Sequence, residues 1–262
     1  MKKLMFAAAA IAAGVAVADV TSANIVGYSA TPQVAENKFY IGNAPFEGVG
    51  ADGTIKISQL VTTDAQPGGY DTMESQAPMI EVLKANGVGY DLYYYIEDAD
   101  DGTERFDITG WADDGGNIAD ANEIVCGTAF WYKSVGGPST LTMPGQVMND
   151  ASVTKSLNAN KFALIGNPFP IALVPTKLSQ TFPAGGYDTM ESAAPMIEVL
   201  KANGVGYDLY YYIEDADDGT ERFDITGWAD DGGNIVTDPI VGVSLGFWIK
   251  LYDDAGDLTF AK

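Results

Sequence analysis

Short apolar segments separated by glycine, proline, asparagine and aspartate recur along the chain. Met79-Ile-Glu-Val-Leu-Lys84 is followed by Ala-Asn-Gly-Val-Gly and then by Tyr90-Asp-Leu-Tyr-Tyr-Tyr-Ile-Glu97. An Asn-Gly step between two such segments is the strongest short-range signal for a β-hairpin, and the second segment is rich in aromatic and β-branched residues. The pattern therefore predicts two antiparallel strands joined at Asn86-Gly87.

Strand alternation divides the second segment between two faces of the sheet. The faces carry Leu92, Tyr94 and Ile96 on one side and Tyr93 and Tyr95 on the other. A helix over Glu74–Ala85 competes with the first strand, because Pro78 fits a first helical turn and Asn86-Gly87 fits a helix end. Periodicity does not decide between the two in a segment this short.

Further strands are expected downstream of the hairpin. An acidic turn at Asp98–Gly102 precedes a strand at Arg105–Thr109, and Gly127–Lys133 and Ser139–Met143 supply two more. Frequent Gly and Pro between short strands favours a sandwich or a barrel. The sequence thus predicts an all-β protein with two tandem β-sandwich or barrel-like domains.

An internal repeat sets the domain organisation. Gly68–Ile118 recurs as Gly185–Ile235, and the only difference is Gln76 in the first copy against Ala193 in the second. Repeats of this length are domains in tandem rather than the turns of a solenoid. We expect a signal peptide at residues 1–18, one repeat domain at 19–145 and a second at 146–262.

The N-terminus has the pattern of a secretory signal. Lys2 and Lys3 precede an apolar segment from Leu4 to Val17, and small residues form an Ala-Val-Ala site before Asp19. The apolar segment is too short and too rich in alanine for a comfortable membrane span. The prediction is Sec-type export, so that the protein is secreted or held at the cell surface, with no membrane span in the mature chain.

Charge and composition exclude several classes of function. The chain carries a net charge of −22, and loss of Lys2 and Lys3 with the signal takes −22 to −24. This charge repels phosphate backbones and disfavours nucleic acid as a partner. The absence of histidine removes Ser-His-Asp and Cys-His catalysis and histidine-ligated metals. Cys126, the only cysteine, aligns with Val243 and is expected to be a buried core residue.

Acidic turns are candidate calcium sites, because clustered carboxylates suit an oxygen-seeking cation. The spacing does not follow the EF-hand pattern, and a solvated hairpin tip that discourages edge pairing is the alternative. Asp113-Asp114 and Asp230-Asp231 would add ligands if the fold brings them alongside. The candidate ligands for Ca²⁺ are Asp98, Asp100, Asp101, Glu104, Asp215, Asp217, Asp218 and Glu221.

Aromatic side chains form a second candidate site, a flat face for stacking sugars. Its candidate residues are Tyr93, Tyr95, Trp111, Tyr210, Tyr212 and Trp228. Aromatic residues of a sandwich more often pack in its core or across strands. Trp131 and Trp248 are interpreted as core and strand-edge residues. Glycoside hydrolysis is a minor alternative, since it needs two acids at a set separation, one of them buried.

Four motifs carry a resemblance to a known group of proteins. They are Asn160-Lys-Phe-Ala-Leu-Ile-Gly-Asn-Pro-Phe169, Gly110-Trp-Ala-Asp-Asp-Gly-Gly-Asn117, Gly246-Phe-Trp-Ile-Lys250 and Leu141-Thr-Met-Pro-Gly-Gln-Val147. In this order they resemble exported tandem β-repeat proteins of environmental bacteria. The resemblance implies an extracytoplasmic β architecture and no catalytic residue. The first copy departs from it with an alanine inserted in Gly42-Asn-Ala-Pro-Phe46.

Together these features favour a non-catalytic structural or adhesive protein, a subunit of a cell surface, matrix or filament. Its expected partners are other copies of itself, surface proteins or glycans. The alternative is a tandem carbohydrate-binding module that uses exposed tyrosines. In either case no cofactor other than Ca²⁺ is expected.

Overall fold

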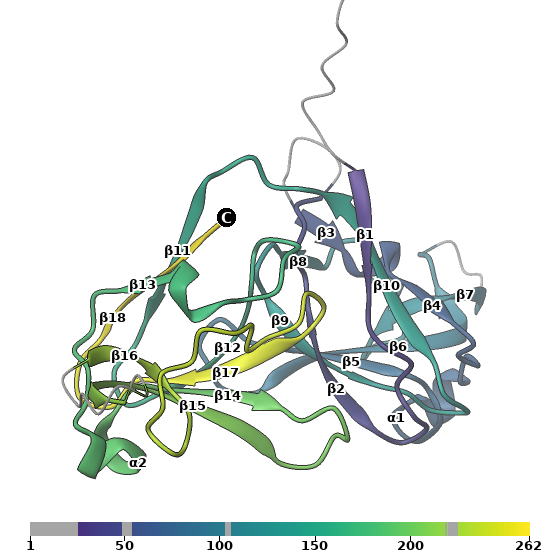
Figure 1. The fold of residues 1–262 in the computed structure, drawn as a ribbon. Helices are drawn as coiled ribbons and strands as arrows, with labels where there is room; N and C mark the ends of the chain where they lie inside the picture. Colours follow the sequence, from purple (N-terminus) through teal and green to yellow (C-terminus); the bar gives the residue numbers. More distant parts are fainter. Residues whose placement is uncertain (1–25, 49–53, 103–105, 218, 220–224) are drawn as a thin grey trace, which may run out of the picture.

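The computed structural model describes residues 26–48, 54–102, 106–217, 219 and 225–262, and confirms an all-β fold. The signal-peptide prediction lies outside the described residues. The named strands pair in antiparallel sheets, and each copy of the repeat has one five-stranded and one three-stranded sheet. In Figure 1 the two copies lie side by side, with the strands β12 and β17 near the middle.

The first copy has a five-stranded sheet and a three-stranded sheet around one core. The larger sheet has the order β2 (Phe39–Asn43), β9 (Ala129–Lys133), β5 (Met79–Leu83), β6 (Tyr90–Asp100) and β7 (Phe106–Asp113). The smaller has the order β1 (Val26–Ala30), β10 (Thr140–Gln146) and β4 (Val61–Thr63). A short pair, β3 (Thr54–Lys56) and β8 (Glu123–Val125), completes this copy.

The second copy repeats the plan. Its five-stranded sheet has the order β12 (Phe162–Gly166), β17 (Gly246–Lys250), β14 (Met196–Leu200), β15 (Tyr207–Ala216) and β16 (Ile225–Ala229). Its three-stranded sheet has the order β11 (Ser152–Leu157), β18 (Gly256–Ala261) and β13 (Leu178–Gln180). The short helices are η1 (Ile57–Gln59), η2 (Tyr70–Thr72), α1 (Met73–Gln76), η3 (Pro175–Lys177), η4 (Tyr187–Thr189) and α2 (Met190–Ala193). No helix in the described ranges is long and apolar enough to cross a membrane.

Each copy has its own hydrophobic core between its two sheets. In the first copy Phe130 and Trp111 from the larger sheet pack with Leu141 from the smaller. In the second copy Phe247 and Phe260 do the same, with ring centroids 6.4 Å apart. Strands that face each other across a buried layer of this kind form a β-sandwich, and burial of the apolar layer holds the two sheets together.

The Asn-Gly hairpin is confirmed, and the competing helix is wrong over most of its predicted length. Lys84 N–H donates to the carbonyl of Gly89 over 3.1 Å, and Gly87 has φ +72°, which glycine adopts without strain. Within Glu74–Ala85 only the residues of α1 are helical, and β5 begins directly after Pro78. Proline lacks the N–H that would continue the helix, so the chain leaves it there.

The predicted alternation along β6 is confirmed, but neither face of the strand is open. Tyr93 points into the core between the sheets, whereas Tyr94 and Ile96 lie on the outer face beneath Met73 and Ala77. The segment that was expected to compete as a helix thus covers one end of the outer face of the sheet. The second copy has the same arrangement in its own cluster of buried residues.

Equivalent tryptophans of the two copies differ in one hydrogen bond. Trp111 Nε1 donates to the carbonyl of Leu60 over 3.1 Å, whereas the buried Nε1 of Trp228 has no hydrogen-bond partner among the described residues. A buried unsatisfied N–H costs free energy, and removing the donor of a formed bond leaves a carbonyl unsatisfied.

We therefore expect Trp111→Phe to lower the free energy of unfolding by about 1–3 kcal/mol more than Trp228→Phe does. Both substitutions remove the same volume, so each is the control for the other. The measurement is urea unfolding followed by circular dichroism. Equal losses in the two variants would contradict the assignment of the Leu60 hydrogen bond.

Candidate functional site

The six aromatic residues predicted to bind glycans do not form an exposed face. Trp111 is 1% exposed, Trp228 is 3% and Tyr93 is 5%. The three remaining residues are half-buried and pack against the two cores; they are Tyr95, Tyr210 and Tyr212. Both tryptophans have a tyrosine ring 5.5 Å away, centroid to centroid. A sugar cannot stack on rings that already pack against one another, so this set loses its geometric support as a glycan platform.

The carboxylates of the acidic turns accept hydrogen bonds from the backbone. Asp98 Oδ1 accepts from the N–H of Tyr70 over 2.7 Å, and Asp100 Oδ1 accepts from the N–H of Gly102 over 2.7 Å. Asp217 repeats the second contact with Gly219 over 2.7 Å. These are side-chain-to-backbone bonds of the kind that stabilise turns.

The calcium prediction stays a prediction. Asp101 and Asp215 are exposed, whereas Glu104, Asp218 and Glu221 lie outside the described residues. Within the part of the chain that the structure describes, no group of three or more acidic or cysteine side chains is placed to hold a metal ion.

The turn at Asp113–Asn117 lies alongside the acidic turn at Asp98–Gly102, and backbone hydrogen bonds join the two. Asp100 N–H donates to the carbonyl of Gly116 over 2.9 Å. Within the turn, Asp113 Oδ1 accepts from Gly115 N–H, Asn117 N–H and Asn117 Nδ2, at 2.9, 3.0 and 3.1 Å. Asp230 holds the turn of the second copy in the same way. These contacts explain the Asp-Asp-Gly-Gly-Asn motif as a structural turn.

The two copies meet at a junction where each contact has a counterpart. Asn43 N–H donates to the carbonyl of Ser244 over 3.0 Å, and Gly166 N–H donates to the carbonyl of Gly127 over 3.0 Å. Gly127 and Ser244 are equivalent positions of the repeat, as are Asn43 and Gly166. Reciprocal contacts between equivalent surfaces define an approximate two-fold axis between the copies.

The equivalence of Asn43 and Gly166 corrects the expectation of an inserted alanine. Phe39 pairs with Lys133 and Asn43 with Ala129, just as Phe162 pairs with Lys250 and Gly166 with Gly246. Phe39–Phe46 and Phe162–Phe169 therefore have equal lengths. The Gly-Asn step is shifted by one residue between the copies, so that the asparagine occupies a different position in each.

This shift makes the two halves of the junction unequal. Asn43 is fully buried, and its Nδ2 donates to the carbonyls of Asn167 and Val243 over 2.9 and 3.0 Å. A Cβ atom on Gly166 would lie 1.9 Å from Asn43 Oδ1. At the second pair of equivalent positions, a Cβ on Gly246 would lie 2.3 Å from the Cβ of Ala129. The larger side chain of each pair thus faces a glycine.

Apolar side chains complete the junction around this polar centre. Ile41, Ala129, Leu164 and Leu200 form a buried cluster. Four half-buried residues pack against it, Leu83 and Tyr207 from the two hairpins and the tryptophans Trp131 and Trp248. The tryptophans, which were expected in the core or at a strand edge, lie on the outer faces of the five-stranded sheets.

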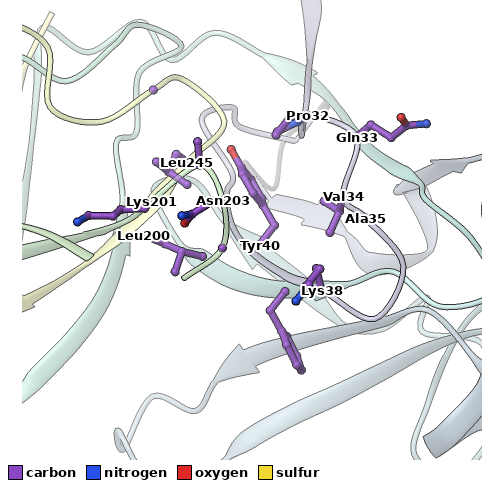
Figure 2. Close-up of a pocket in the computed structure, with 14 residues that line it drawn as sticks. Pro32, Gln33, Val34, Ala35, Lys38, Tyr40, Leu200, Lys201, Asn203 and Leu245 are labelled. Atoms are coloured by element: carbon purple, nitrogen blue, oxygen red, sulfur yellow. The ribbon is translucent and has the colours of Figure 1, made fainter. Parts of the chain in front are cut away.

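Two equivalent clefts lie at the edges of the junction. The Tyr40 cleft has a volume of about 350 Å³, and its lining residues include Lys38, Tyr40, Leu200, Lys201 and Asn203. In Figure 2 Tyr40 extends toward the space between Pro32 and Leu245, with Lys38 and Lys201 on opposite sides of it. The Tyr40 hydroxyl lies 3.1 Å from Ser244 Oγ, so it joins the two copies.

The counterpart of this cleft belongs to the other side of the junction. The Ala163 cleft has a volume of about 290 Å³, and Lys161, Ala163, Leu83, Lys84 and Asn86 line it. They occupy the same positions of the repeat as the five residues named for the Tyr40 cleft. Among these five positions the two clefts differ only where Ala163 replaces Tyr40.

A third hollow adjoins the Tyr40 cleft. This Trp131 hollow has a volume of about 380 Å³ and is lined in part by Phe39, Glu81, Trp131 and Tyr207. Burial raises the pKa of Glu81, and the nearby Lys133 ammonium opposes that rise. Glu81 is the one carboxylate among the described residues that line this hollow. Glycoside hydrolysis uses a pair of acids, and a single acid lines this hollow.

The junction was not visible in the local sequence pattern. The repeated Asn-Lys-Phe segment did place Lys38 and Lys161 at equivalent positions, and the duplicated hairpin did the same for Lys84 and Lys201. The sequence pattern did not predict that the tip of each hairpin contacts the other copy. A scan of family models, a search of curated proteins and a search of solved structures each returned no match.

Exchanging the unequal pair tests the junction. Gly166→Asn alone places two asparagines face to face, and Asn43→Gly alone leaves the carbonyls of Asn167 and Val243 without their donor. We expect each single variant to lose about 1–3 kcal/mol of unfolding free energy. The double variant restores one asparagine opposite one glycine.

The double variant should therefore lose less than the sum of the two single losses, by about 1 kcal/mol or more. Urea unfolding of the four proteins measures this coupling. Additive losses would show that Asn43 and Gly166 do not act on each other.

Cys126 lies at the junction and, as expected, is buried. Its Sγ donates to the carbonyl of Pro168 in the other copy over 3.3 Å. Burial is the main cause that raises the pKa of Cys126 to about 12, and the Glu47 carboxylate adds to it. Because the thiolate is the reactive form, a pKa this high leaves the thiol almost entirely protonated at neutral pH.

We expect Cys126 in the folded protein to react with a disulfide reagent at pH 8 far more slowly than in the urea-unfolded chain. The reaction should accelerate as pH approaches 12, where the thiolate forms. Release of the coloured thiol product gives both rates. Equal rates in folded and unfolded protein at pH 8 would show that the junction is open.

Proposed function

We propose that this chain is an exported, non-catalytic structural or adhesive protein that acts as a subunit of a cell surface, matrix or filament. The unequal junction is the observation that carries the proposal. A subunit that transmits a fixed geometry needs its domains held at a set angle, and reciprocal backbone hydrogen bonds with a buried asparagine supply that constraint.

The use of the repeated polar residues supports the same role. Asp98, Asp100 and Asp113 hold backbone turns, and Trp111 packs in the core. The most conspicuous acidic and aromatic motifs are thereby accounted for by folding.

A carbohydrate-binding module is the second candidate, in a different place from the one that the sequence suggested. The hollow beside Trp131 and Tyr207 supports it, because two half-buried aromatic residues line it.

Strand exchange offers a mechanism for assembly. β1 lies at one edge of its sheet and pairs with β10 alone, from Val26 with Gln146 to Ala30 with Thr142. The same register is available when β1 of one chain pairs with β10 of a neighbour. Tyr28, in the middle of β1, is 77% exposed and points away from the core of its own domain.

We expect the mature chain to form large particles in light scattering and electron microscopy, and deletion of Asp19–Ser29 to reduce their size. The matched control is Tyr28→Thr, which keeps the strand backbone and its hydrogen bonds. If the deletion leaves particle size unchanged, strand exchange is wrong. If the full mature chain remains monomeric at all concentrations, the subunit role is wrong.

Thermal unfolding of the same samples with Ca²⁺ and with chelator tests whether the native protein binds Ca²⁺. An ion bound to the native state raises the midpoint by mass action, in proportion to the logarithm of its concentration. Magnesium is the control, since it prefers strict octahedral geometry and shorter bonds. An identical midpoint in Ca²⁺ and in chelator would rule out a stabilising calcium site.

A further inference from the structure

The junction clefts are basic places on an acidic protein. The chain carries 36 acidic and 14 basic residues, yet two lysines line each cleft. No Asp or Glu is among the described residues that line the Tyr40 cleft or the Ala163 cleft. We propose that each of these two clefts binds a carboxylate-bearing sugar unit of an acidic polysaccharide. The inference rests on the adhesive role proposed above and names its ligand class.

The two lysines of each cleft have different surroundings. Lys201 Nζ lies 3.6 Å from Asp208 Oδ1, and Lys84 Nζ lies 3.7 Å from Asp91 Oδ1, both across the base of a hairpin. Lys38 and Lys161 are exposed and form no ion pair with a described residue. The ammonium groups of Lys38 and Lys161 are therefore the ones available to a ligand carboxylate.

The net charge of the protein limits how such a ligand is held. A polyanion is repelled at long range, but salt screens exposed charges beyond about 8 Å at physiological ionic strength. At contact distance a ligand carboxylate meets Lys38 or Lys161, and a charge-assisted hydrogen bond to a carboxylate is about twice as strong as a neutral one. Recognition is therefore short-range and depends on the cleft.

The walls of the Tyr40 cleft favour a ring over an extended acidic peptide. Phe39, Tyr40 and Leu200 supply apolar surface, and the amide of Asn203 and the hydroxyl of Tyr40 are polar groups at its edge. A few polar groups on a mostly apolar wall are typical of small-molecule sites, and about 350 Å³ lies at the small end of their range.

The Trp131 hollow adjoins this site, and Lys133 lies near Glu81, the one acid that lines the hollow, so that the next sugar of the chain is placed there. It shares Phe39, Leu200 and Gly204 with the Tyr40 cleft, so the two hollows adjoin each other. Trp131 and Tyr207 line the Trp131 hollow but not the Tyr40 cleft. The C–H face of a sugar carries partial positive charge and packs on the negative face of an aromatic ring. An oligosaccharide with one sugar in each hollow would cross Phe39, which lines both.

Calorimetric titration of the full mature chain with trigalacturonate tests the proposal. Maltotriose is the neutral probe, and triglutamate is the acidic peptide probe. The variants are Lys38→Gln, Lys161→Gln and the double variant, with Lys56→Gln as a control on an exposed lysine outside both clefts. Thermal midpoints of all variants establish that they are folded.

We expect one trigalacturonate per cleft, at least tenfold weaker binding of maltotriose and triglutamate, and about a tenfold loss at the altered cleft in each single variant. Lys56→Gln should bind as the unaltered chain does. No binding of trigalacturonate up to millimolar concentration, or unchanged binding by the double variant, would overturn the proposal. Equal binding of maltotriose or of triglutamate would overturn the ligand class.

The titration tests the cleft proposal and the assembly measurement tests the subunit proposal, so each can be contradicted without the other. Particles that form in a protein that does not bind trigalacturonate would leave the subunit role standing and remove this inference. A monomer that binds trigalacturonate at both clefts would remove the subunit role and keep the clefts.

Discussion

The buried side chain of Asn43 fixes how the two copies meet. Its amide donates to two carbonyls of the other copy, and it occupies the space left by the missing side chain of Gly166. An exactly symmetric pair would place two asparagines in contact or two glycines across a void. Duplication alone therefore does not produce this junction. The one-residue shift of the Gly-Asn step between the copies, together with the pairing of Ala129 with Gly246, makes two similar surfaces complementary.

The unequal junction has a consequence for association between chains. Because the surface of the first copy fits that of the second better than it fits itself, each chain satisfies both surfaces internally, at the high effective concentration that a short connection gives. The junction surfaces are then not available for growth of a polymer, and a closed contact of this kind does not propagate. Any filament must use other surfaces, and the edge strand β1 with its exposed Tyr28 is such a surface.

Local pattern predicted the elements of this fold well and their surroundings poorly. The Asn86-Gly87 hairpin and the alternation along β6 follow from short-range chemistry, and both are confirmed. The tyrosines expected on an open face instead pack toward the cores between the sheets, and on the outer face of the first copy α1 covers one end and the second copy covers the other. Trp131 looked like a core residue because it stands in an apolar strand. Its place in the junction depends on contacts between copies, which no window of sequence contains.

Lysine side chains suit the clefts for an electrostatic reason. Each hairpin tip must approach the other copy, and both partners belong to a chain with a net charge of −22. Placing acids at the closest approach would add like-charge repulsion to the cost of desolvation. Lysines at the rim avoid that repulsion, and their long side chains keep the ammonium groups in water. The lysines at the edge where the copies pack are thus also the groups that the proposed anionic ligand contacts. The same residues would serve packing of the two copies and binding of the ligand.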